Sequence, residues 1–220
     1  TIHQSHIEQL HTRDQYLLRH KGQAYIELSD LGAGKTAYTR NSQYLAKVFA
    51  PYFPEAEKAF MIELGQQNQT ATFNKNTLMI SPQETLKRAL FWESYLKKYP
   101  QSPLKKDAEY LLNAYSYFFF IGLADSPVSI NFEGAIDIQP STLSEIEQLA
   151  THKNSPLAEQ ARRFLKFIDL SNDQRHKLVS SNTENTTPQV QLIQYLKLKP
   201  IDLNQVQSRN CFSDAICRSN

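Results

Sequence analysis

Four dipeptides constrain the fold of this chain more than any other feature, because each joins a hydroxyl residue to a proline. They are Ser81-Pro82, Ser102-Pro103, Ser155-Pro156 and Thr187-Pro188. A hydroxyl at the N-cap accepts a hydrogen bond from a free backbone N–H of the first helical turn. Proline at the next position lacks only an N–H that has no helical partner. The dipeptides therefore predict four helix starts, and Glu84 predicts a capping box with Ser81.

Apolar residues recur at three- and four-residue spacing after these starts, which is typical of amphipathic helices. The predicted helices cover residues 4–19, 42–49, 54–67, 82–98, 103–121, 142–152, 156–170 and 188–199. Gly122 is the expected C-cap of the helix over 103–121. The run 110–124 is the most apolar, but it is shorter than the ~20 residues that a bilayer span needs, and Asn113 and Ser116 interrupt it. It predicts a buried helix and no membrane span.

Strand signals are short and local. Turn-forming residues separate three pairs of short β-prone runs, which predicts hairpins over 24–39, 71–80 and 129–138. The fold class is therefore mainly α, built of helix hairpins with one or two small β-hairpins. We expect an N-terminal mixed subregion at 1–75 and an α-helical domain at 76–220, or one continuous domain.

The two cysteines, Cys211 and Cys217, are six residues apart. We expect them to form a disulfide, which in so short a loop contributes about 2 kcal/mol. Two reduced thiols are the alternative. A disulfide, together with the absence of Met before Thr1, favours a mature periplasmic or secreted protein.

Composition excludes several classes of protein. The chain of 220 residues has 12 Phe and 11 Tyr, only 6 Gly and a net charge of +2. So many aromatic residues with so little net charge are not typical of a disordered or low-complexity chain. A net charge of +2 also provides no basic excess for nucleic-acid binding.

No pattern identifies a cofactor or metal site. Residues Gly32 to Thr36 resemble the end of a phosphate-binding loop, but Ser29 stands where that loop needs glycine. His3, His6 and His11 are close in sequence, but a metal site also needs converging ligands and a second shell, so we interpret them as solvated.

No pattern identifies a catalytic site either. A glycosidase needs two carboxylates at a set separation across a cleft, and nothing in the sequence sets one. The carboxylate pairs considered are Glu133 with Asp137 and Glu145 with Glu147. We therefore expect no catalytic, cofactor or metal residues, and a cell-wall-directed hydrolase is retained as an alternative.

Charge distribution points to a binding role instead. Residues 107–150 contain seven acids and no Lys or Arg, and three of these acids lie in residues 125–140, the acidic loop. An acidic face suits a basic partner, although neighbouring helices are able to neutralise it. The candidate partner-binding residues are Asp125, Glu133, Asp137, Tyr115 and Tyr117. The two tyrosines belong to an aromatic cluster that we interpret first as core packing, with a ligand or partner pocket as the alternative.

Two segments align with each other, residues 101–115 with residues 154–168. The first contains Tyr99-Pro-Gln-Ser-Pro103, then Asp107-Ala108 and Leu111-Leu112, and it resembles tetratricopeptide-like repeats of bacterial envelope proteins. The resemblance covers residues 82–170 and implies stacked helix hairpins with a concave surface for a peptide or protein. The Ser-Pro starts are 53 residues apart, unlike the roughly 34 of a regular repeat, and a compact helical domain is the alternative.

The expected function is therefore a non-enzymatic protein- or peptide-binding protein of the bacterial cell envelope. The first alternative is an inhibitor or immunity protein that blocks a toxin or hydrolase through the acidic loop, and the second is the hydrolase.

Overall fold

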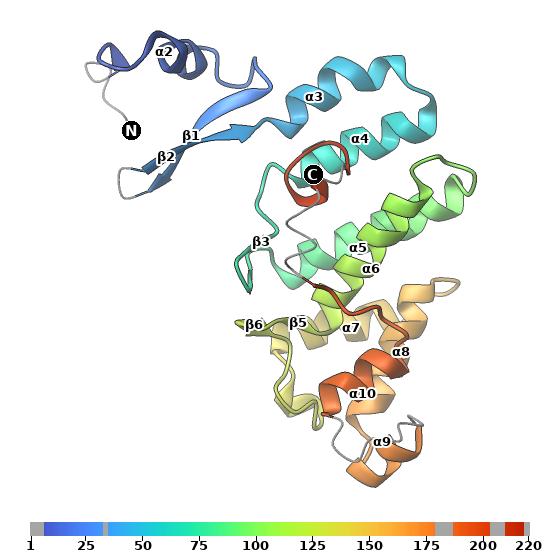
Figure 1. Cartoon of the computed structure of the whole chain (residues 1–220). Coiled ribbons are helices and arrows are strands. Elements are labelled where there is room, and N and C mark those ends of the chain that lie inside the picture. Colours follow the sequence, from blue (N-terminus) through green and yellow to red (C-terminus); the bar gives the residue numbers. More distant parts are fainter. Residues whose placement is uncertain (1–6, 33–34, 179–186, 203–209, 218–220) are drawn as a thin grey trace. The chain divides into compact units, whose positions relative to one another are not determined.

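The computed structural model describes residues 7–32, 35–178, 187–202 and 210–217 (Figure 1). It is 58% helical with short two-stranded antiparallel sheets, which confirms the mainly α fold class. Contacts divide the chain into a first unit, Thr1–Thr70 with Gln207–Asn220, and a second unit, Ala71–Val206. The first unit thus includes residues 207–220, which the sequence assigns to the α-helical domain.

The first unit joins a β-hairpin to a helix pair. Its elements are α2 (Thr12–Arg19), β1 (Ile26–Gly32), β2 (Lys35–Arg40), α3 (Ser42–Phe49), η1 (Ala50–Tyr52), α4 (Glu55–Gln67) and η3 (Asn210–Phe212). Strands β1 and β2 form the hairpin predicted over 24–39, and its register pairs Ile26 with Arg40 and Leu28 with Tyr38. Gly32, Lys35 and Thr36 therefore lie in these strands, whereas a phosphate-binding loop would need a helix to begin there.

Helices α3 and α4 approach closely at a glycine. The Ser42 hydroxyl donates to the Gly65 carbonyl at 2.7 Å. A Cβ at Gly65 would lie 3.0 Å from the Cβ of Ala46, so a larger side chain would force the helices apart. The small core beside this contact consists of Ala46, Ala50, Met61 and Ala215.

Ala215 belongs to a loop closed by the disulfide Cys211–Cys217, which confirms the predicted pairing. The Asn68 amide donates to the carbonyls of Cys211 at 2.9 Å and of Asp214 at 2.6 Å. The buried Asp214 carboxylate accepts from the Tyr25 hydroxyl at 2.5 Å. These contacts fix residues 210–217 onto the first unit, although they lie far away in sequence.

The second unit consists of helix hairpins (Figure 1). Helix α5 packs on α6 and α7 packs on α8. Its elements are β3 (Phe73–Asn74), β4 (Thr77–Leu78), α5 (Pro82–Lys98), α6 (Lys105–Phe120), β5 (Gly122–Leu123), β6 (Ser126–Pro127), η2 (Ala135–Asp137), α7 (Pro140–Ala150), α8 (Pro156–Ile168), α9 (Asn172–Leu178) and α10 (Pro188–Tyr195).

Three of the four predicted hydroxyl caps are present. Ser81 accepts from the N–H of Glu84, Ser155 from that of Ala158, and Thr187 from that of Val190. The prediction for Ser102 is wrong. Its hydroxyl accepts from the N–H of Leu104 at 3.1 Å and bonds the Tyr95 hydroxyl at 2.8 Å, and α6 begins only at Lys105.

The Glu84 side chain does not form the predicted capping box but binds another side chain. It accepts from the Arg88 guanidinium at 2.7 Å. Arg88 is buried and also donates to the Thr72 hydroxyl at 3.0 Å, so Glu84 balances a buried charge instead of capping α5.

The predicted hairpin over 129–138 is wrong. The strands that form are β5 and β6, which begin at Gly122 with its φ of +83°. Downstream, Phe132 has a φ of +55°, which breaks the alternation that a strand requires. Phe132 is therefore buried, while Ile130 and Ile136 are exposed.

Aromatic side chains of α6 fill the core of the second unit, as the run 110–124 predicts. Tyr115, Phe118, Phe119 and Phe120 are all fully buried, and Phe120 packs on Phe164 of α8. Among the described residues, no helix combines the length and the apolarity that crossing a bilayer requires.

Candidate functional site

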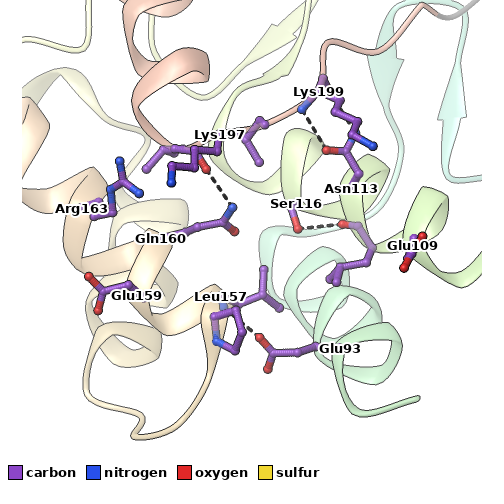
Figure 2. A pocket seen from close by; sticks show the side chains of 14 residues that line it. Glu93, Glu109, Asn113, Ser116, Leu157, Glu159, Gln160, Arg163, Lys197 and Lys199 are labelled. Atoms are coloured by element: carbon purple, nitrogen blue, oxygen red, sulfur yellow. Dashed lines mark hydrogen bonds between the residues drawn. The ribbon is translucent and has the colours of Figure 1, made fainter. Parts of the chain in front are cut away.

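A groove of about 560 Å³ lies between α6 and α8 in the second unit (Figure 2). We call it the α6–α8 groove. Residues Leu196–Lys199, which follow α10 and which we call the strap, form one of its sides. Its lining residues are Glu93, Glu109, Leu112, Asn113, Ser116, Pro156, Leu157, Glu159, Gln160, Arg163 and Leu196 to Lys199.

Helical spacing explains why α6 presents this face. Glu109, Leu112, Asn113 and Ser116 recur at three- and four-residue intervals and so share one side of the helix. The opposite side is apolar and buried in the core; it carries Leu111, Ala114, Tyr115 and Phe118. The groove wall is therefore a consequence of the same periodicity that builds the core.

The strap begins where α10 is terminated by a Schellman-type turn. Lys197 has a φ of +57°, its N–H donates to the Gln194 carbonyl, and the Leu198 N–H donates to the Ile193 carbonyl. The helix predicted to reach Lys199 therefore ends at Tyr195.

Two side chains hold the main chain of the strap in the groove. The Asn113 amide donates to the Lys199 carbonyl at 3.0 Å and accepts from the Lys199 N–H at 2.9 Å. Gln160 donates to the Leu196 carbonyl at 3.0 Å (Figure 2). Leu196 is buried and Lys197 is exposed, and Leu198 and Lys199 repeat this alternation. The groove walls thus hold the last turn of α10, at Leu196, and the chain after it, at Lys199, by contacts with the backbone.

Glu93 of α5 connects the two helix hairpins. Its carboxylate accepts from the Ser155 hydroxyl at 2.9 and 3.0 Å and from the Leu157 N–H at 2.8 Å. A carboxylate at the N-terminus of α8 is favourable because it faces the positive end of the helix dipole. Glu93 therefore fixes the position of α8 against α5 at the floor of the groove.

The charges of the groove are unequally paired. Glu159 accepts from Arg162 at 2.8 Å, and Glu109 lies 3.9 Å from Lys105. Arg163 lies over the Tyr195 ring, 4.4 Å from its centroid. In the part of the chain that the structure describes, neither Lys197 nor Lys199 has a carboxylate within 4.0 Å. The groove thus has positive charge available for a ligand.

The residues predicted to bind a partner lie outside this groove. Tyr115 is fully buried, where it accepts from Arg88 at 3.4 Å, and burial raises the pKa of its hydroxyl. A partner has no access to Tyr115 in this structure, so its predicted role is not supported. Tyr117 is half-buried beside Gln189, and burial raises its pKa too.

The three predicted acids lie in the acidic loop. Asp125 and Glu133 are exposed. Asp137 is directed toward its own loop, where its carboxylate accepts from the Ser129 hydroxyl at 2.5 Å and from the N–H of Asn131 at 3.2 Å. These donors hold the pKa of Asp137 below its usual range. Asp137 therefore shapes the loop rather than presenting its charge.

Sequence reasoning missed Glu93, Asn113 and Gln160. Asn113 is the only one with a visible signal, because a polar amide in the most apolar run of the chain needs hydrogen-bond partners. The partners of all three come from distant segments.

Within the described residues, no group of three or more His, Cys, Asp or Glu side chains is placed to hold a metal ion. His3 and His6 lie outside those residues, and His11 accepts from the Arg13 N–H at the start of α2. No family model, curated protein or solved structure matches this chain.

Proposed function

We propose that this chain is a non-enzymatic binding protein of the bacterial cell envelope, and that its α6–α8 groove holds an extended, acidic peptide segment of a partner protein. One observation carries the proposal: Asn113 and Gln160 already hold a segment of chain, the strap, by its backbone carbonyls and N–H at Leu196 and Lys199. Side chains that bind a backbone recognise a conformation, which is how a peptide groove accepts partners of differing sequence.

The lining of the groove supports a peptide that carries both apolar and acidic residues. Leu112, Pro156 and Leu157 provide apolar surface beside the strap. Lys197 and Lys199 are exposed and have no carboxylate partner among the described residues. An acidic side chain of the ligand would be attracted to these two cations.

The disulfide supports the proposed compartment. Disulfides persist in the periplasm and outside the cell, where thiols are not kept reduced. Cys211–Cys217 also closes a loop that several side chains of the first unit hold, so its role is structural. The inhibitor and the hydrolase have no comparable support in the groove.

The test is direct binding of a defined peptide library. Fluorescein-labelled nonapeptides, capped at both ends, would be measured against the whole chain by fluorescence anisotropy. We expect the binders to contain Asp or Glu next to Leu, Ile or Phe. Lys199→Glu should weaken them about three- to tenfold, since attraction becomes repulsion at an exposed position.

Lys166→Glu is the matched control, because Lys166 is also exposed, lies on α8 and does not line the groove. It changes the net charge equally and should leave the Kd unchanged. Equal effects of both variants, or no peptide bound below about 1 mM, would contradict the proposed function.

A further inference from the structure

We propose that the acidic loop is a second interaction surface, and that Ile130 and Ile136 insert together into an apolar recess of a partner protein whose rim carries Lys or Arg. This surface is separate from the α6–α8 groove, so the inference does not depend on the proposed function. It follows from the rigidity of the loop, from the exposure of the two isoleucines and from the sign of the surrounding charge.

Asp137 gives the loop a fixed shape. Its Oδ2 accepts from the Ser129 hydroxyl at 2.5 Å, from the Asn131 N–H at 3.2 Å and from the Glu133 N–H at 3.3 Å. Ile130 lies between the first two donors, and Ile136 immediately precedes the acceptor. Both isoleucines are therefore one residue away from the same hydrogen-bonded centre, which fixes the backbone next to each of them.

Phe132 attaches the loop to the helices. Its ring is fully buried and packs edge-on against Phe164 of α8, with 6.1 Å between the centroids. Its carbonyl accepts from the buried Arg175 guanidinium at 2.5 Å. The Gly134 N–H donates to the Ile168 carbonyl at 2.9 Å. The loop is thus bound to α8 and α9 at three points.

The rest of the chain does not bury the two isoleucines, so they do not contribute hydrophobic stabilisation to its fold. Ile130 is 79% exposed and Ile136 is 97% exposed, whereas Phe132 and Ile138 in the same loop are buried. Burying an isoleucine side chain is favourable, because it removes apolar surface from water. Binding normally costs conformational entropy, because it orders a flexible loop. This loop is already ordered in the free chain, so less entropy is lost when the two isoleucines bind a partner.

The surrounding charge selects the kind of partner. Asp125 and Glu133 are exposed in the loop, and residues 107–150 contain no Lys or Arg. A partner with a basic rim around its apolar recess would be attracted. An anionic lipid surface would be repelled, although it also accepts apolar side chains, so the charge favours a protein over a membrane.

The experiment places a photo-reactive benzoylphenylalanine at position 136 of the whole chain. The chain is irradiated in an envelope extract of the source organism, and the adduct and its cross-linked peptide are identified by mass spectrometry. The captured protein is then purified, and its Kd for the unlabelled chain is measured by calorimetry. We expect Ile130→Ser to weaken binding about tenfold or more, and 0.5 M salt to weaken it further.

Met79→Ser is the matched control, because Met79 is 56% exposed in the same unit and lies outside the loop. It should leave the Kd unchanged. The proposal is overturned by the absence of a protein adduct, by an adduct with lipid, or by equal Kd values for Ile130→Ser and the unchanged chain. Lys199→Glu should leave this Kd unaltered, so failure of the groove and failure of the loop are distinguishable.

Discussion

The two units reach stability by different routes. The second unit takes its core from large aromatic side chains on several helices, among them Trp92 of α5, Phe120 of α6 and Phe164 of α8. The first unit buries fewer large side chains: Phe60 and Leu64 of α4 are fully buried, and a cluster of three alanines and a methionine includes one alanine from the disulfide loop. A small core contributes little hydrophobic energy, so a covalent cross-link is valuable there. The comparison predicts that the two units respond to different perturbations.

The largest expected effect is in the aromatic core. Phe164→Ala removes a fully buried ring that contacts both Phe120 and Phe132. We expect the free energy of unfolding to fall by about 3–5 kcal/mol. Trp92 is the only tryptophan and lies in the second unit, so its fluorescence in guanidinium reports on that unit. Met79→Ala, at an exposed position, should change little. A loss below about 1 kcal/mol for Phe164→Ala would contradict this view of the core.

Removal of the disulfide should affect only the first unit. The double variant Cys211→Ser with Cys217→Ser is expected to destabilise it by about 2 kcal/mol, since the loop is short. Amide hydrogen exchange of α3 and α4 should become faster by the corresponding factor. The guanidinium concentration at the midpoint of the Trp92 unfolding transition should not change. A shift of the Trp92 transition by the same amount would show that the units unfold together.

Alanine substitutions at two glycines, one in each unit, distinguish the cost of backbone strain from the cost of steric crowding. Gly122 has a φ of +83°, and a Cβ there would lie 2.4 Å from the Ser126 carbonyl oxygen. Gly22 has a φ of +80° with nothing within 4 Å. We expect Gly122→Ala to cost about 2 kcal/mol or more and Gly22→Ala about 1 kcal/mol, each measured by hydrogen exchange in its own unit. Equal losses would mean that β6 moves aside freely.

Lowering the pH is expected to have the smallest effect on stability. Hydrogen bonds lower the pKa of Asp137 in the second unit, chiefly from Ser129, and of Asp14 in the first, chiefly from Tyr38. A lowered pKa stabilises the folded state above the ordinary value of about 3.9, and this stabilisation is lost as the pH falls further. Amide exchange in the acidic loop should therefore accelerate below about pH 3.9 relative to the Asp137→Asn variant, in which the amide does not titrate. An identical pH profile for both chains would contradict the role of Asp137.

Local signals in the sequence were sufficient for most of the helices. Ser81, Ser155 and Thr187 are caps because a cap depends on only a few neighbouring residues. Ser102 has the same dipeptide, but Tyr95 competes for its hydroxyl and the helix begins later. The end of α10 at Tyr195 was missed because Lys197, rather than a glycine, adopts the positive φ.

The candidate site was much less accessible to sequence reasoning. Asn113 meets Lys199 across 86 residues, and Ser155 meets Glu93 across 62. No spacing rule reaches so far, because these pairs depend on how the hairpins stack. The sequence identifies the acidic loop as a candidate, but Ile130 and Ile136 rather than Asp137 face outward.

The attachment of residues 210–217 to the first unit has a consequence for biogenesis. Asn68 and Tyr25 bind a loop that is synthesised only after the whole of residues 71–206. The second unit is continuous in sequence, and its contacts are available as soon as it leaves the ribosome or the translocation channel. The first unit is made first and completed last, so until then its helix pair lacks Ala215, and the apolar surface that Ala215 covers stays open to water.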